Sequence, residues 1–270
     1  MPWHEPERSP PPWRTTIAPL SHLQRLPLAG YPILSVSATT LCSLLQERLA
    51  ASQKTVLLFA NTNFVLKCQL LRSWLQNDDV VLVNDGIGLD VAAWLMHQRR
   101  YRQNLNGTDF VPHLLKNLIA QRKIFLLGGV PGVAQQAAAV IERDLGHPVV
   151  GCLDGYSKVP DATLCEQINR SGSEIVLVAM GNPIQEQWIH ANIGKLDAKL
   201  FIGVGALFDF LSGNARRAPQ WVQQIRCEWL FRLSLEPKRL MRRYTLDIVS
   251  FLRLCLRDRH ASGHPKSAPM

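Results

Sequence analysis

The strongest constraint on the fold is an alternation, from about residue 31 to residue 204, of short apolar runs with longer segments of helical periodicity. The apolar runs have the length and composition of buried strands. We expect strands at 32–36, 55–60, 79–83, 123–127, 148–153, 174–180 and 200–204, and helices at 39–50, 63–76, 87–98, 108–121, 132–145, 161–170 and 184–193. Because parallel strands need crossover connections, this alternation predicts an α/β fold with a parallel sheet and helices on both faces.

The alternating part lies between segments of different composition. Residues 1–30 contain seven prolines among polar residues, which predicts a mostly disordered leader. Residues 216–260 set apolar residues at helical spacing among arginines, which predicts a helical, basic, amphipathic appendage. The expected division is therefore a leader at 1–30, an α/β core at 31–215, the appendage at 216–260 and a frayed tail at 261–270.

The charge of the chain is positive and uneven. Lys and Arg number 30 against 21 Asp and Glu, giving a net charge of +9, and +7 of it lies between residues 216 and 259. Nucleic acid, an anionic membrane surface and a phosphorylated substrate are all partners that such a charge attracts. The six cysteines form no C-x-x-C pair, and no apolar stretch is long enough to cross a membrane, so we expect reduced thiols in a cytoplasmic protein.

The stretch 80–90, VVLVNDGIGLD, runs from a buried strand through a turn into a helix. In an open α/β sheet, ligands bind just outside the carboxyl ends of the strands, so a carboxylate there faces the ligand. Asp85 is therefore the first candidate for chemistry. The structural alternative is that Asp85 only caps the helix that begins near Gly88.

Three further loops follow apolar strands. Gly128 and Gly129 open a Gly-rich loop before a helix, which favours a bound phosphate, although an ordinary turn has the same pattern. Gln185, in GNPIQE, carries a donor and an acceptor suited to a base edge or a sugar hydroxyl. Asp209 places a second carboxylate at the same edge of the sheet as Asp85.

Several familiar signals are missing from the sequence. It contains no G-x-G-x-x-G, Walker loop, H-E-x-x-H or D-x-D, and its eight histidines have no C-x-x-C pair to complete a zinc site. We therefore expect no metal site and no metal-dependent sugar transfer of the D-x-D type. The segment NDGIG is only a weak match to a methyltransferase loop, because Asn84 stands where that loop needs an acid.

Eight motifs in order resemble those of the WecG/TagA/CpsF glycosyltransferases, glycosyltransferase family 26, over about residues 34–244. They read NDGIG, NLNGTDF, FLLGGVPGVA, GNPIQEQWI, VGALFDFLSG, RRAPQW, EWLFRL and EPKRLMRRY. The ANTNF and NLNGTDF motifs are most similar to those of GumM-type glucosyltransferases of exopolysaccharide assembly. The resemblance implies the Rossmann-like architecture called GT-E, with a C-terminal appendage that meets the membrane.

The resemblance also implies an activity: inverting transfer of a sugar from a UDP-sugar to a polyprenyl-diphosphate-linked glycan. The UDP-sugar is a substrate, and no cofactor is implied. The family's general base falls on Asp85, and its appendage arginines fall on Arg232, Arg239 and Arg242. Bidentate guanidinium groups are suited to a departing diphosphate, although any single arginine could instead bind anionic lipid.

The match to the family motifs places further substrate contacts on Asn61, Asn63 and Asp109, beside Gly128, Gly129, Gln185 and Asp209. Two positions depart from the family pattern. Phe59 stands where the family usually has a threonine, and Asn104 stands where it tends to have an arginine. The role of that threonine and one cation near the substrate are therefore not expected in this chain.

The expected function is transfer of a hexose, glucose in the first instance, at the cytoplasmic face of the bacterial inner membrane during surface polysaccharide assembly. The alternative within the family is transfer of N-acetylmannosamine or N-acetylmannosaminuronate. A nucleic-acid-binding protein is a rival that the high pI alone favours, but it needs exposed aromatics along a basic groove. A membrane-bound scaffold without activity is a third reading.

Overall fold

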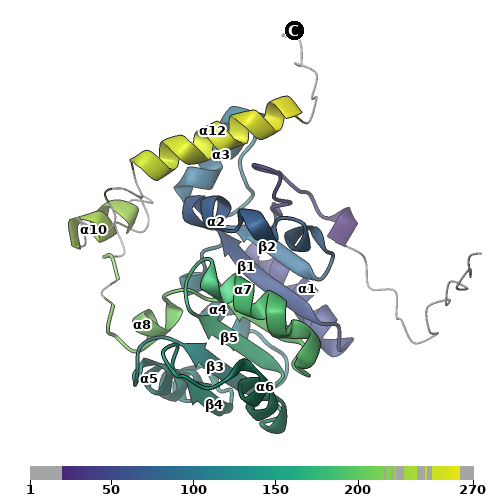
Figure 1. Ribbon diagram of the computed structural model, residues 1–270, viewed down its shortest axis with the longest axis vertical. Coiled ribbons are helices and arrows are strands. Elements are labelled where there is room, and N and C mark those ends of the chain that lie inside the picture. The colour runs from purple at the N-terminus through teal and green to yellow at the C-terminus, as the bar shows by residue number, and fades with distance from the viewer. Residues whose placement is uncertain are drawn as a thin grey trace, which may run out of the picture.

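The computed structural model describes residues 20–215, 217–219, 222, 228–235, 241 and 245–261 (Figure 1). Its α-helices are α1 Ala38–Ala50, α2 Thr62–Lys67, α3 Ile87–His97, α4 Gly107–Lys116, α5 Val133–Val140, α6 Asp161–Arg170, α7 Ile184–Asn192, α8 Leu207–Leu211, α10 Glu228–Leu235 and α12 Leu246–Ala261. Short helical turns are η1 Leu20–His22, η2 Gln69–Leu71, η3 Trp74–Gln76, η4 Ile141–Leu145 and η5 Ile193–Lys195.

The strands form one six-stranded sheet in the order β2-β1-β6-β5-β3-β4, and every pairing is parallel. Their bounds are β1 Thr55–Ala60, β2 Val80–Asn84, β3 Ile124–Gly128, β4 Val149–Leu153, β5 Ile175–Ala179 and β6 Leu200–Gly203. Five of them are buried along their whole length, as parallel strands covered by helices on both faces must be. The predicted α/β fold class is confirmed.

Each face of the sheet has its own hydrophobic core. On one face, α2, α3, α6 and α7 pack on the strands through residues such as Phe64, Leu89 and Ile189. On the other face, α1, α4, α5 and α8 pack through residues such as Leu45 and Phe208. Successive crossovers therefore cover both faces, and the carboxyl ends of all six strands meet at one edge.

Polar side chains set where three of these helices begin. The side-chain oxygens of Ser37, Asn61 and Asn106 accept hydrogen bonds from backbone N–H groups in the first turns of α1, α2 and α4, at 2.9–3.1 Å. Ser and Asn are favoured at this position because their short side chains satisfy a donor that has no partner within the helix. The same sequence signal thus starts two helices, α2 and α4, close to the ligand-binding edge.

Three expectations from the sequence need correction. The segment 32–36 is not a strand of the sheet, because it touches β2 through a single bridge between Leu34 and Val83 at the outer edge. Residues 20–30, assigned to the leader, are packed: Leu20, Leu26 and Leu28 are buried. Their apolar side chains cover the edge beside β2, whereas the remainder of the predicted leader, 1–19, lies outside the described residues.

The predicted helix 63–76 is three short pieces, α2, η2 and η3.

The last described helix, α12, packs against α2 and α3 at the end of the molecule where β2 lies (Figure 1). Among the side chains of α12 that the structure describes, Phe251 and Cys255 are buried, and both join the core of that face. The helical character expected for the appendage holds for α10 and α12. Within the described ranges, no helix is long and apolar enough to cross a membrane.

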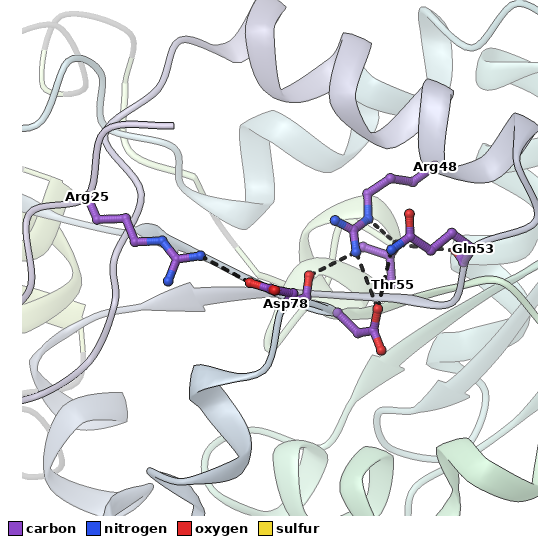
Figure 2. A network of polar contacts seen from close by, with 6 residues as sticks. Arg25, Arg48, Gln53, Thr55 and Asp78 are labelled. Atoms are coloured by element: carbon purple, nitrogen blue, oxygen red, sulfur yellow. Dashed lines mark hydrogen bonds and ion pairs between the residues drawn. The ribbon is translucent and has the colours of Figure 1, made fainter. Parts of the chain in front are cut away.

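A buried arginine links α1 to the amino ends of β1 and β2, which lie opposite to the carboxyl ends of the strands (Figure 2). The guanidinium of Arg48, from α1, donates to Thr55 Oγ1 at 2.9 Å and to the carbonyl oxygen of Asp78 at 2.8 Å, and lies 3.4 Å from Asp79 Oδ1. Its side chain is only 2% exposed, and burial lowers its pKa while the two aspartates raise it. Arg25 reaches Asp78 from outside at 3.6 Å. These contacts fix α1 to the starts of β1 and β2.

We predict that Arg48→Met lowers the free energy of unfolding by about 2–3 kcal/mol, because the buried hydroxyl of Thr55 and the partly buried carbonyl of Asp78 lose their donor. Urea denaturation followed by circular dichroism measures the change. The matched control is Arg143→Met, since Arg143 forms a shorter ion pair with Asp144 but its side chain is 70% exposed. Equal urea midpoints for the two variants would contradict a structural role for Arg48.

Candidate active site at the carboxyl edge of the sheet

The parallel sheet brings most of the predicted site residues to one edge. Asn61 follows β1, Asp85 follows β2, Gly128 ends β3, and Gln185 and Asp209 lie in the helices after β5 and β6. In the order of the sheet, the β2 loop and the β3 loop are four strands apart, about 19 Å at the usual strand spacing. A ligand that touches both must therefore lie across the ends of β1, β6 and β5.

Asp85 is held by the neighbouring strand. Its backbone N–H donates to the carbonyl of Ala60 at 2.7 Å, which continues the β1–β2 ladder by one step. The Asn61 amide nitrogen donates to Asp85 Oδ2 at 3.3 Å, and the Asn61 amide oxygen caps α2. The carboxylate is half-buried and comes just before Gly86, which has φ of +99° and precedes α3. Its position at the strand end matches the expectation from the sequence.

Asn104 and Asn84 lie beside the same turn, and sequence reasoning missed both as site residues. Asn104 Oδ1 accepts from the backbone N–H of Gly86 at 2.7 Å, so the residue at the family's arginine position fixes the turn after Asp85. Asn84 is fully buried, and within the described part of the chain its side-chain amide has no hydrogen-bond partner. A buried amide in that state costs about 1–3 kcal/mol, next to the proposed base. The only signal for Asn84 in the sequence is its place directly before Asp85 in NDG.

Gln185 joins the loops after β5 and β6. Its amide oxygen accepts from the backbone N–H of Gly181 at 3.2 Å and of Gly205 at 3.1 Å. The side chain is 3% exposed and lies against β6 at Gly203, where an added Cβ would come within 2.8 Å of the amide nitrogen. Both ends of the Gln185 amide therefore bond protein groups. Its role as a ligand contact stays a prediction.

A buried carboxylate completes this arrangement. Glu186 is fully buried, and its Oε1 accepts from Gln185 Nε2 at 2.8 Å and from Asn182 Nδ2 at 2.7 Å. The Cys68 thiol, from the end of α2, lies 3.7 Å from Oε2. Burial raises the pKa of Glu186, and the bonds from Gln185 and Asn182 lower it in part. A polar chain therefore runs from the core beneath α2 to two loops of the site.

The glycines of the β3 loop have a structural reason of their own. A Cβ on Gly128 would lie 2.3 Å from the carbonyl oxygen of Ala179, in the adjacent strand β5. The next residue, Gly129, donates its N–H to the same carbonyl at 2.9 Å, with φ of +74°. A larger residue at 128 would therefore disturb the sheet before it could affect a ligand. The predicted phosphate contact at this loop remains a prediction.

Two more predicted contacts lie near the start of helices. Asp209, in α8, is half-buried, and burial raises its pKa. Asp109, in the first turn of α4, is exposed and forms an ion pair with Arg217. Asn106 Nδ2 also donates to Asp109 at 2.7 Å. The Asp109 contact connects the segment that follows α8 to the edge of the site.

The remaining predicted site residues are Asn63 and the three arginines of the appendage. Asn63 is half-buried in the first turn of α2, whereas Phe59, at the family's threonine position, is core and lies 6.2 Å from the ring of Phe110. Arg239 and Arg242 lie outside the described residues. Arg232 falls within α10, but its side chain is not described. The described residues hold no group of three His, Cys, Asp or Glu side chains placed for a metal ion.

A hollow of about 450 Å³ lies at the opposite edge of the sheet, far from Asp85, and is not part of the candidate site. Its polar side chains are engaged with protein: Arg122 pairs with Glu174 at 2.6 Å, and Asn169 bonds the backbone of Lys195 and Asp197.

We predict that Glu186→Gln gains stability relative to the wild type as the pH rises from 5 to 8. Because burial raises the pKa of Glu186, the folded state keeps a proton that the unfolded chain releases above about 4.5, so wild-type stability falls as pH rises through this window. Glutamine keeps an acceptor for both amides and does not titrate. Urea midpoints at several pH values measure the difference.

The matched control is Glu166→Gln, whose side chain is 66% exposed on α6. Its stability should follow the wild type at every pH. Parallel profiles for Glu186→Gln and the wild type would mean that burial does not hold a proton on Glu186.

Comparison with known proteins confirms the family that the sequence motifs resemble. The family model described as "Glycosyl transferase WecG/TagA/CpsF family" matches residues 26–264. The N-acetylglucosaminyldiphosphoundecaprenol N-acetyl-beta-D-mannosaminyltransferase of Bacillus subtilis (strain 168) is 34% identical over 176 residues, which cover 62% of this chain and 68% of the relative. Because the family model spans nearly all of the folded chain, the protein belongs to the WecG/TagA/CpsF family of glycosyl transferases.

Proposed function

We propose that this glycosyl transferase moves N-acetylmannosamine from a UDP-linked donor to a polyprenyl-diphosphate-linked acceptor sugar, with inversion at the anomeric carbon. The observation that carries the proposal is the carboxylate of Asp85, which stands in the family's D-G motif at the ligand-binding edge of a parallel sheet. The B. subtilis relative is named for transfer of N-acetylmannosamine to a lipid-linked acceptor. That name favours the N-acetylmannosamine alternative over the glucose that we expected first.

Asp85 acts as the general base. Inversion needs one group to take the proton from the attacking hydroxyl while the bond between sugar and phosphate breaks on the other face of the ring. The hydrogen bond from Asn61 orients the carboxylate, and the bond from Asn104 to Gly86 holds the turn beneath it. The residue after β1 and the loop before α4 thus hold the base before the acceptor arrives.

The donor lies across the loops after β6, β5 and β3. The carboxylate of Asp209 accepts from hydroxyl or N–H groups of the nucleoside and repels the diphosphate, so it belongs at the nucleoside end. Gln185 keeps the β5 and β6 loops in register for this contact. The N-termini of α5 and α7 face the same edge and favour negative charge.

The diphosphate leaves with its charge balanced by arginines of the appendage, Arg232, Arg239 and Arg242, and the reaction needs no metal. Guanidinium groups hold phosphate oxygens in pairs and stabilise charge as it develops. Full turnover is therefore expected in EDTA. Activity that EDTA abolishes and magnesium or manganese restores would overturn this part of the proposal.

We predict that Asp85→Asn cuts turnover by about 10²–10⁴-fold, the usual contribution of a general base. The substitution is nearly isosteric and leaves an acceptor for Asn61, so the urea midpoint and the affinity for UDP should be unchanged. Stopped assays with radiolabelled donor measure turnover, and calorimetry measures UDP binding. Turnover within threefold of the wild type would remove Asp85 from the role of base.

The identity of the donor is tested with a panel of UDP-N-acetylmannosamine, UDP-N-acetylmannosaminuronate and UDP-glucose, each with a polyprenyl-diphosphate-linked N-acetylglucosamine acceptor. The proposal expects the highest kcat/KM with UDP-N-acetylmannosamine. UDP-glucose is the second candidate, because the ANTNF and NLNGTDF motifs are similar to those of GumM-type enzymes. A higher kcat/KM with UDP-glucose would restore the exopolysaccharide reading.

The acceptor places the enzyme at the cytoplasmic face of the bacterial inner membrane. The net charge of +7 between residues 216 and 259 attracts anionic lipid at about 1 kcal/mol per Lys or Arg near the surface. Nucleic acid is not a partner in this proposal.

A further inference from the structure

Helix α3 carries an apolar surface that its own fold does not cover. Ile87, Val91, Trp94 and Leu95 are 42%, 47%, 48% and 39% exposed, and their spacing of four, three and one residues puts them on one side of the helix. The opposite side, with Leu89, Ala92 and Ala93, is fully buried in the core. The stripe is about 12 Å long at the usual helical rise.

Exposed arginines follow this stripe directly. Arg99, Arg100 and Arg102 lie just after the C-terminus of α3, and all three are exposed. The chain has no Asp or Glu between Asp90, which is buried, and Asp109. An apolar helical face with a tryptophan and an adjoining arginine cluster is the pattern of a helix that lies in a membrane interface.

Helix α12 extends the same kind of surface. It packs against α3 and lies at the same end of the molecule (Figure 1). Leu246, Val249 and Leu256 are 65%, 48% and 45% exposed, and Arg253 and Arg257 are also exposed. Two adjacent helices, one in the catalytic core and one in the appendage, thus present apolar side chains and arginines at one end.

We propose that the exposed face of α3 is a membrane-docking surface for an anionic bilayer, formed by the catalytic core itself. A second copy of the chain fits less well, because the same face on the partner would offer these arginines no acidic side chain from residues 91–108. The arginines and Trp94 instead match anionic headgroups and the interfacial zone of a bilayer. The purpose of this docking rests on the proposed lipid-linked acceptor, because α3 begins beside Asp85.

The first test is the variant Val91→Ser/Trp94→Ser/Leu95→Ser in the full chain, assayed for sedimentation with phosphatidylglycerol vesicles. We expect vesicle affinity to fall at least tenfold with no change in the urea midpoint, because the three side chains are exposed. The matched control is Ile119→Ser, which removes an apolar side chain that is 94% exposed but lies between α4 and β3. Unchanged vesicle affinity in the triple variant would overturn the proposal.

The second test is Arg99→Gln/Arg100→Gln. Vesicle affinity should fall about tenfold at 50 mM salt, and the difference from the wild type should shrink at 500 mM, where charges are screened. Vesicles of phosphatidylcholine alone should show no such difference. A sedimentation-equilibrium shift from dimer to monomer in the triple variant, with vesicle affinity unchanged, would assign the face to a second copy and overturn the proposal.

Turnover separates this inference from the proposed function. The triple variant should keep wild-type turnover with a water-soluble, short-chain acceptor and lose it with a long-chain acceptor in vesicles. If no donor is transferred to any acceptor, the proposed function fails while the vesicle assay still tests the surface. Equal loss with both acceptors would mean that the α3 face serves the site and not the membrane.

Discussion

The loops that would hold the donor depend on one buried amide. Gln185 accepts from the backbone of Gly181 and of Gly205, so the loops after β5 and β6 share a single acceptor. In the low dielectric beneath the site, such bonds are strong, and losing one leaves a buried donor without a partner. The two loops therefore keep one relative position, which depends on the amide oxygen of Gln185.

The carboxylate of Glu186 extends this hydrogen-bond network from Gln185 into the core. Its Oε1 orients two amides at once, those of Gln185 and Asn182, and thereby decides which end of the Gln185 amide faces the loops. At the other side of the sheet edge, Asn61 and Asn104 do the equivalent for Asp85 and its turn. The site is thus supported from two sides by side chains that reach it from neighbouring strands and helices.

The sequence was sufficient for the general plan and insufficient for the contacts. Alternating apolar runs predict six of the strands, because a parallel strand buried on both faces leaves a clear pattern. The run at 32–36 has the same pattern, but only its position outside β2 decides that it makes one bridge. Burial of residues 20–30 was likewise invisible, because their partners are distant in the chain.

The same limit applies to the site. The position of Asp85 after an apolar run could be predicted, since every parallel strand ends at the same edge. That Asn104 would reach Gly86 could not, because the bond crosses 18 residues and depends on where α4 starts. Gln185 was singled out for its chemistry, yet pattern alone does not say which way a side chain points. Donor identity depends on a few contacts of similar kind, so the motif wording favoured glucose where the relative's name favours N-acetylmannosamine.

The absence of any linker between Asp85 and α3 has a geometric consequence. Asp85 is followed by one glycine and then by a helix of 11 residues, about 16 Å long. If that helix lies in the membrane interface, it fixes the distance between Asp85 and the lipid surface. Only a hydroxyl on a sugar close to the lipid diphosphate then comes within reach. Such an enzyme would select acceptors by the distance of their hydroxyl from the membrane. It would therefore add its sugar early, while the lipid-linked glycan is still short.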